Sequence, residues 1–208
     1  MIEHFYKNIP GWFGFKEQYE KMIQIISDDG VWVELGCYCG KSLSWLMVER
    51  HNQHKQFSVH AVDAWPLASD SEQYLQQTDP NGKFRNFGYH KFKNALQLFE
   101  GKYTEHRNIS WLAAQSFKDN SIDYAMVDAG HTYEMVIQDL EAWWPKIKPG
   151  GYFGGDDYET RGGGVKQAVD EFFSAKNYTV TINPNLKEFK KRDGKYYSND
   201  NNNWLVQK

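Results

Sequence analysis

The sequence predicts an α/β protein whose parallel sheet is covered by helices on both faces. Three observations support this fold class: strand-like runs end in glycine or aspartate, amphipathic segments with helical spacing follow them, and the two patterns alternate along the chain. Strands and helices that alternate in this way form a parallel sheet. With 208 residues, the chain is expected to form a single domain over residues 1–208.

The expected elements can be placed in chain order. A helix over Lys16–Ser27 belongs to an N-terminal cover, residues 1–27, which precedes the first strand. The expected strands are Val31–Leu35, Phe57–Val62, Ile109–Ala113, Ile122–Val127 and Tyr152–Gly155. The expected helices after the first strand are Lys41–His51, Phe84–Glu100, Tyr133–Ile147, which Pro149–Gly151 should stop, and Val165–Ala175.

Two segments depart from the alternation. Tyr178–Ile182 and Trp204–Gln207 are strand-like, with only the polar loop Asn183–Asn203 between them, so they should pair antiparallel.

Residues 65–83 form the longest irregular stretch in the interior of the chain. Long loops in compact domains are usually lids or binding loops, and we expect this one to contact the substrate.

The charge balance excludes some classes of partner. The chain has 24 Lys and Arg against 27 Asp and Glu, and no basic run is longer than Lys190–Arg192. A general nucleic-acid binder would carry a basic patch, so no nucleic acid is expected as partner. No signal peptide and no long apolar run are recognisable, so we expect a cytoplasmic protein without a membrane partner. Cys37 and Cys39 are expected to be small turn residues rather than metal ligands.

A glycine turn follows the first expected strand. Gly36 and Gly40 lie four residues apart and lead into a helix, whose N-terminal N–H groups can receive a carboxylate or phosphate. Tyr38 occupies the place of the middle glycine of the dinucleotide fingerprint, so a pyrophosphate site is not expected. A tight turn without a ligand is the alternative.

The second expected strand ends at Asp63, where an acidic side chain can accept hydrogen bonds from ribose hydroxyls. The alternative is a helix cap or a solvated loop carboxylate. Together with a glycine turn that lacks the pyrophosphate pattern, Asp63 favours a nucleoside ligand without phosphate.

Carboxylates also follow the fourth and fifth expected strands. Asp128 ends one, and Asp156 with Asp157 ends the other. A divalent cation would relieve their repulsion, and an all-oxygen set suits Mg²⁺ or Mn²⁺. The alternative is that these residues cap turns and the next helix.

His131 follows Asp128 by three residues and could act as a base, bind a metal, or cap a helix.

These residues resemble the class I S-adenosylmethionine-dependent methyltransferases, in particular the branch of small metal-dependent O-methyltransferases with their cephalosporin hydroxylase-like relatives. The resemblance rests on GWFGF, VELGCYCGKS, VDAW, IDYAMVDAGHTYEMVIQDLEAWWPKIKPGGYFGGDDY and GVKQAVDEF. It implies a Rossmann-like, three-layer α/β/α domain. Its seven-stranded, mostly parallel sheet would have the order 3-2-1-4-5-7-6, with strand 7 antiparallel.

The resemblance also implies roles for individual residues. Asp63 would bind the ribose hydroxyls of S-adenosylmethionine, and Gln115 or Ser116 would lie near its adenine. The full implied cofactor-binding set is Glu34, Gly36, Tyr38, Gly40, Ser42, Asp63, Ala64, Gln115, Ser116 and Asp128. Asp128, Asp156 and Asp157 fall on the metal ligands of the family. His131 stands where the catechol-type enzymes have a lysine.

The expected function is methyl transfer from S-adenosylmethionine to a hydroxyl of a small molecule, with help from Mg²⁺ or Mn²⁺ and with His131 as proton acceptor. A methyltransferase that acts on a small amine is the first alternative. A non-catalytic nucleotide-binding module of the same fold is the second. The sequence leaves the acceptor and a homodimer open.

Overall fold

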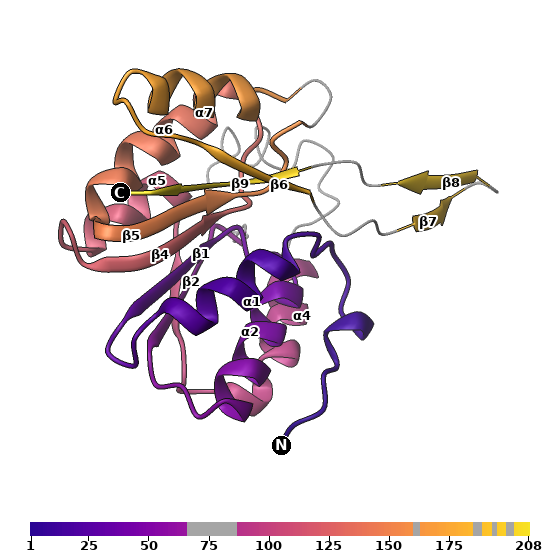
Figure 1. Ribbon diagram of the computed structural model, residues 1–208. Helices are drawn as coiled ribbons and strands as arrows, with labels where there is room; N and C mark the ends of the chain where they lie inside the picture. Colours follow the sequence, from indigo (N-terminus) through magenta and orange to yellow (C-terminus); the bar gives the residue numbers. More distant parts are fainter. Residues whose placement is uncertain (66–86, 160–162, 185–188, 193–194, 199–201) are drawn as a thin grey trace.

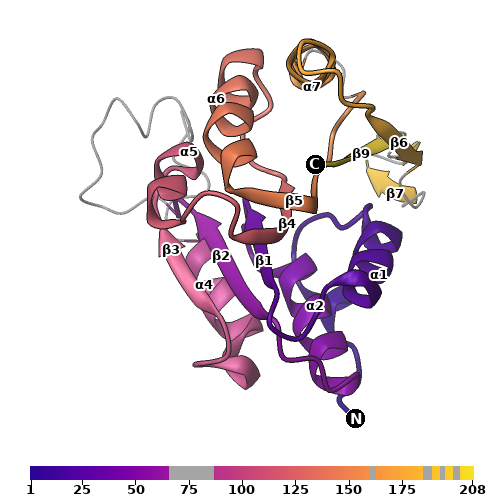
Figure 2. The same cartoon turned by 60° about the vertical axis from the view of Figure 1, so that its left-hand side comes forward.

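The computed structural model describes residues 1–65, 87–159, 163–184, 189–192, 195–198 and 202–208. A central sheet separates two layers of helices (Figures 1 and 2). The strands of this sheet are β1 (Val31–Leu35), β2 (Ser58–Asp63), β3 (Thr104–Arg107), β4 (Ile122–Val127), β5 (Ile147–Gly155), β6 (Thr181–Pro184) and β9 (Asn202–Gln207). The α-helices are α1 (Lys16–Ile25), α2 (Lys41–Asn52), α4 (Phe87–Ala95), α5 (Ser110–Ala113), α6 (Tyr133–Trp143) and α7 (Val165–Ser174). Short 3-10 helices are η1 (Tyr6–Asn8), η2 (Gln97–Phe99), η3 (Ala114–Ser116) and η4 (Trp144–Lys146).

The sheet has the order β3-β2-β1-β4-β5-β9-β6. Strands β1 to β5 pair in parallel, whereas β9 pairs antiparallel with both β5 and β6. With β9 as the seventh strand of the sheet, this confirms the predicted order and its reversed last strand.

A hairpin corrects the expectation of a polar loop over Asn183–Asn203. Strands β7 (Phe189–Arg192) and β8 (Lys195–Ser198) pair antiparallel in a separate two-stranded sheet. The sequence between them is Asp-Gly, a strong hairpin signal that the polar composition of the segment had masked.

The third strand also differs from the expectation. Ile109–Ala113 is not a strand: β3 is Thr104–Arg107, and Ser110–Ala113 forms helix α5. Because β3 lies at the edge of the sheet and pairs only with β2, its side chains are at most partly buried. An edge strand tolerates such a polar sequence, and the apolar pattern therefore pointed to the wrong segment.

The end of α6 and the start of β5 are corrected as well. The helix expected over Tyr133–Ile147 ends at Trp143, and Pro145 lies in η4. Strand β5 begins at Ile147 and includes Pro149–Gly151, with an irregular register opposite Ile122 and Tyr124. Pro149–Gly151, predicted to stop the helix, instead form a distorted stretch near the start of a strand, where proline and glycine are tolerated.

Two apolar clusters form the core, one on each face of the sheet. Trp32 and Tyr124 contribute to the cluster under α1, α2 and α4, whereas Val33 and Ala125 contribute to the cluster under α6 and α7. Neighbouring residues of a strand point to opposite faces, which explains this division. Helix α1, Lys16–Ile25, confirms that the segment predicted as a helix is helical. No helix in the described part of the chain is long and apolar enough to cross a membrane.

Candidate active site

Backbone hydrogen bonds connect the carboxyl ends of four neighbouring strands, β2, β1, β4 and β5. The residue directly after a strand donates its backbone N–H to the last or next-to-last carbonyl of the adjacent strand. These bonds are Gly36 N to Val62 O (2.8 Å), Asp128 N to Leu35 O (2.8 Å) and Asp156 N to Val127 O (3.0 Å). The sequence-predicted residues therefore share one edge of the sheet, where open α/β sheets bind ligands.

The glycine turn after β1 has two positions that need glycine. Gly36 has φ +86°, and a Cβ there would lie 1.8 Å from the carbonyl oxygen of Asp128. Gly40 has φ +81° and stands directly before α2, where a Cβ would lie 3.0 Å from the Phe92 ring. Tyr38 between them also has a positive φ, 45°. A side chain held in this region is a source of backbone strain, which proteins concentrate at functional sites.

Asp63 connects this turn to the loop after β2. Its carboxylate accepts hydrogen bonds from the backbone N–H of Tyr38 (2.7 Å) and of Trp65 (2.8 Å). Trp65 Nε1 donates to the Tyr38 carbonyl (2.8 Å), and Arg107 donates to the Trp65 carbonyl (2.7 Å). Burial raises the pKa of Asp63, and the backbone donors oppose that shift. Each carboxylate oxygen has a second lone pair, so the predicted ribose contact is compatible with these bonds.

Glu34 and Ser42 lie beneath the turn. Glu34 is 1% exposed, and its two carboxylate oxygens accept hydrogen bonds from Tyr19 Oη (2.7 Å) and Ser42 Oγ (2.6 Å). Burial raises the pKa of Glu34 to about 7, although both hydroxyls oppose the shift. These contacts link β1 to α1 and α2, so Glu34 and Ser42 help to fix the shape of the turn.

The remaining implied cofactor residues are at least partly exposed. Ala64 is partly exposed between Asp63 and Trp65, and Gln115 and Ser116 are exposed in η3. The loop expected at residues 65–83 lies, apart from Trp65, outside the described residues.

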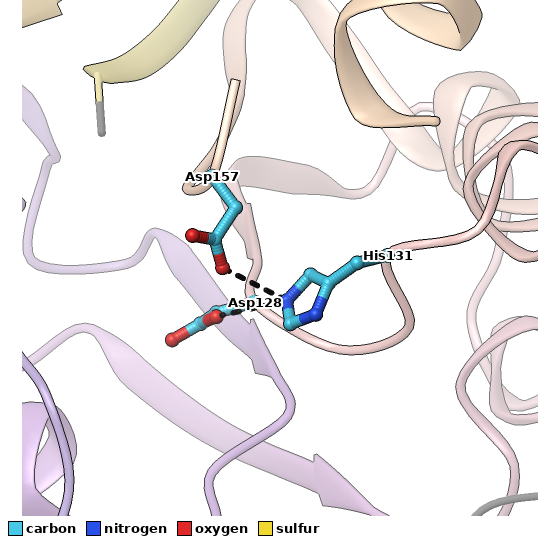
Figure 3. A group of neighbouring side chains, drawn as sticks. All are labelled: Asp128, His131 and Asp157. Carbon is cyan, nitrogen blue, oxygen red and sulfur yellow. Dashed lines mark ion pairs between the residues drawn. The ribbon is translucent and has the colours of Figure 1, made fainter. Parts of the chain in front are cut away.

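Three side chains converge beside the glycine turn (Figure 3). One nitrogen or oxygen atom from each of Asp128, His131 and Asp157 lies within 4.8 Å of the others. His131 Nε2 is 2.9 Å from Asp157 Oδ2 and 3.8 Å from Asp128 Oδ1. By distance, only the Asp157 contact is a hydrogen bond, and the Asp128 contact is a longer ion pair. Asp128 and then Asp157 raise the pKa of His131 to about 10. The two carboxylates therefore favour the protonated, positively charged imidazole.

Asp156 does not join this group. It is 6% exposed, and its charge contributes to the raised pKa of Tyr124, for which burial is the main cause. The group that converges includes Asp157, whose carboxylate faces His131 (Figure 3), but not the adjacent Asp156. The structure therefore brings together Asp128, His131 and Asp157 rather than the three aspartates.

Helix α7 holds the segment that carries His131. Gly164, directly before α7, donates its N–H to the His131 carbonyl at 2.7 Å. A Cβ on Gly164 would lie 2.1 Å from the backbone nitrogen of Tyr133, so only glycine fits. Tyr133 in turn hydrogen-bonds Glu171 of α7 at 2.6 Å. Sequence reasoning missed Gly164, although the glycine run at 162–164 was a visible signal.

The same helix holds the segment that carries Asp157. Asp157 has φ +57°, and the next residue, Tyr158, is buried and donates a hydrogen bond to Asp170 of α7 at 2.5 Å. Lys166 donates to the Tyr158 oxygen at 2.9 Å. Sequence reasoning missed this support as well, since nothing in the spacing of Tyr158 and Asp170 indicates that they meet.

Sheet order, the glycine turn after β1 and the acid at the end of β2 together define a class I S-adenosylmethionine-dependent methyltransferase. The chain belongs to a methyltransferase family: residues 33–158 match a family model described as a methyltransferase domain.

Solved structures share this fold at low sequence identity. The O-methyltransferase NovP has a TM-score of 0.62 and 17% identity, covering 92% of this chain and 79% of its own. A Streptococcus mutans protein in complex with SAH has a TM-score of 0.56 and 10% identity, covering 95% of this chain and 99% of its own. At these identities the likeness concerns the fold alone.

A curated sequence relative is uncharacterized protein R132 of Acanthamoeba polyphaga mimivirus. It is 28% identical over 133 residues, which cover 64% of this chain and 53% of that protein. The chain thus spans about half the length of the curated relative it matches.

Proposed function

We propose that the protein transfers the methyl group of S-adenosylmethionine to a hydroxyl of a small molecule, and that a divalent cation bound by Asp128, His131 and Asp157 assists. The observation that carries this proposal is the convergence of these three side chains next to the glycine turn. The methyltransferase family, the likeness to the O-methyltransferase NovP and the SAH complex of a structural neighbour support it.

The donor set fits a divalent cation. Two carboxylates and one imidazole offer three ligand atoms within 4.8 Å of one another, and the His131 side chain is 46% exposed, so an ion could reach them. An imidazole among carboxylates favours Mn²⁺ over Mg²⁺, since Mg²⁺ prefers oxygen ligands. Binding of the ion would displace the proton that the imidazole holds between the two carboxylates.

The methyl group of a sulfonium is already activated, so the protein has mainly to align an oxygen nucleophile with it. A divalent cation at this site would lower the pKa of an acceptor hydroxyl and hold its oxygen in place. The side chains and backbone of the site would position the cofactor and stabilise its charge. Asp63 and the glycine turn would position the nucleoside, while Asp128 and Asp157 would hold negative charge beside the positively charged sulfonium.

For His131 we favour the role of metal ligand. Nε2, the nitrogen that faces both carboxylates, is also the one that would have to take the proton of the substrate hydroxyl. One nitrogen cannot do both at once. General base, the role predicted from the sequence, stays the competing assignment, and metal affinity of a His131 variant separates the two.

The test is a transfer assay with methyl-labelled S-adenosylmethionine and a panel of small phenols, sugars and amines, run with Mn²⁺, with Mg²⁺ and with a chelator. We expect label on a hydroxyl substrate only when the ion is present. Label on an amine that survives the chelator would support the N-methyltransferase instead. Calorimetric binding of S-adenosylmethionine without transfer to any class of acceptor would support a non-catalytic module.

A further inference from the structure

A second cleft lies at the opposite end of the sheet from the candidate active site. Its volume is about 540 Å³, and its lining includes Ser58 and Thr104, the first residues of β2 and β3. The end of α2 forms one wall, and the turn between η2 and β3 forms the other. Both segments lie at the bottom of the view in Figure 1. Nothing in the proposed methyl transfer uses this end of the sheet.

The ionisable side chains at the ends of the two walls are basic. They are Arg50, His51, His54, Lys55 and Lys102, and no Asp or Glu lines it. The whole chain has a net charge of −3, so this concentration of positive charge is local. Basic residues at the end of α2 also interact favourably with the helix dipole. Lys102 belongs to the other wall, however, and the dipole of α2 does not account for it.

Main-chain contacts shape the wall formed by α2. Arg50 donates from Nε to the Phe57 carbonyl (2.7 Å) and from Nη2 to the Gln56 carbonyl (2.9 Å). The backbone N–H of Lys55 donates to the Arg50 carbonyl at 2.9 Å. The turn after α2 is therefore held in place. Within the described residues, Lys55 lines one wall and Lys102 the other, and neither forms an ion pair.

The floor of the cleft is apolar. Met47, Val59 and Phe99 line it and are each at most 2% exposed, and the half-buried Tyr103 adds an aromatic ring. An apolar floor beneath a basic rim is complementary to a ligand with a flat ring and an anionic group. The volume lies within the range of roughly 300 to 1,000 Å³ that is usual for small-molecule sites.

We propose that this cleft binds a nucleoside diphosphate, with the ring against Tyr103 and the phosphates between Lys55 and Lys102. Each lysine would give a charge-assisted hydrogen bond, which phosphate oxygens favour. The two walls carry one lysine each, so a ligand that bridges them can place one phosphate at each lysine.

The experiment measures binding of ADP to the full chain by calorimetry, with and without saturating S-adenosylhomocysteine to block the cofactor site. We expect ADP to bind in both conditions and adenosine to bind more weakly. The double variant Lys55→Ala/Lys102→Ala should weaken ADP binding by about tenfold or more, the scale for loss of charge-assisted hydrogen bonds. Lys118→Ala/Lys176→Ala is the matched control, since it removes the same charge from exposed positions outside the cleft.

Thermal unfolding of both double variants checks that they fold. ADP binding that S-adenosylhomocysteine abolishes, or that both double variants retain equally, would overturn the proposal. A single-stranded oligonucleotide that binds more tightly than ADP through Lys55 and Lys102 would also overturn it, because the occupant would then be a nucleic acid. None of these outcomes depends on methyl transfer, so they test the cleft separately from the proposed function.

Discussion

The backbone N–H of Gly164 donates a hydrogen bond to the carbonyl oxygen of His131 at 2.7 Å. The contact joins the start of α7 to the loop after β4, so the position of the imidazole depends on a helix that contributes no side chain to the site. Tyr158 and Asp170 connect the same helix to the Asp157 segment. Two of the three converging side chains thus share one support.

Gly164→Ala is expected to displace His131. The new Cβ would lie 2.1 Å from the Tyr133 nitrogen, so either the His131 segment or the start of α7 must move. We expect methyl transfer to fall by about 10²-fold, the cost of a displacement of about 1 Å at a reacting centre, with cofactor affinity nearly unchanged. Gln167→Ala, an exposed change on the same helix, is the control. Equal rates for the two variants would contradict the supporting role of Gly164.

His131→Asn tests the two roles of the imidazole. In either role we expect the maximal rate of methyl transfer to fall by about 10²- to 10⁴-fold while affinity for S-adenosylmethionine is retained. If His131 is a ligand, Mn²⁺ affinity measured by calorimetry falls together with the rate. Unchanged Mn²⁺ affinity would assign it as the base. His90→Asn, at an exposed position on α4, controls for the general loss of a histidine.

Asp157→Asn and Asp156→Asn form a matched pair on adjacent residues. Only Asp157 belongs to the converging group, so its variant should lose more Mn²⁺ affinity than the about 10- to 100-fold typical of an outer-shell partner. Asp156→Asn should bind the ion nearly as well as the wild-type protein. A thermal shift with Mn²⁺ measures both. The reverse ranking would restore the three-aspartate site predicted from the sequence.

Asp63→Asn should weaken binding of S-adenosylmethionine by about 1.5 to 3 kcal/mol, the scale for a hydrogen bond to a charged group. Asparagine keeps an acceptor oxygen for one of the two backbone N–H groups, those of Tyr38 and Trp65, whereas alanine would remove both acceptors. Calorimetry gives the affinity, and the melting temperature shows whether the turn is intact. Undiminished affinity would remove Asp63 from the nucleoside site.

Asp139 on α6 makes stability depend on pH. It is fully buried, and among the described residues neither oxygen has a hydrogen-bond partner of normal geometry. Burial raises its pKa to about 7, although nearby Ser110 opposes the shift. The folded protein therefore keeps a proton up to about pH 7 that the unfolded chain releases near pH 4. The free energy of unfolding should fall as pH rises through this window and stay low above it.

Asp139→Asn removes this penalty. At pH 8 we expect the variant to be more stable than the wild-type protein, by at most about 4 kcal/mol at about 1.4 kcal/mol per pKa unit. Near pH 4 the difference should vanish. Urea unfolding at both values measures it, with Glu141→Gln, an exposed change on the same helix, as control. A variant that is less stable at pH 8 would show that Asp139 is charged and stabilised in the folded state.

The central strands could be predicted from the sequence because buried parallel strands are continuous apolar runs. Val31–Leu35 and Ile122–Val127 are the strands that the structure contains. Edge strand β3 was missed because partial burial allows the polar residues of Thr104–Arg107. The apolar segment that follows it packs as a helix, which periodicity over a few residues cannot distinguish from a strand.

The candidate site was predictable in part for a similar reason. Asp63 and Asp128 stand at strand ends, and topology alone brings those ends together. Which side chains meet there depends on local backbone conformation: Asp157, which joins His131, has a positive φ that the spacing of the two aspartates does not indicate. The hydroxyl of Tyr19 reaches Glu34 from a different element, and no spacing along the chain encodes such a contact.

The position of β9 determines when the sheet can be completed as the chain folds during synthesis. Strand β5, which leads into Asp157, has β4 on one side and β9 on the other, and β9 follows β6, β7 and β8 in the sequence. During synthesis the edge of β5 stays open until residues 202–207 have left the ribosome. An open strand edge is a template for pairing with other chains. The nascent protein is therefore most exposed to aggregation just before the Asp157 side of its site is completed.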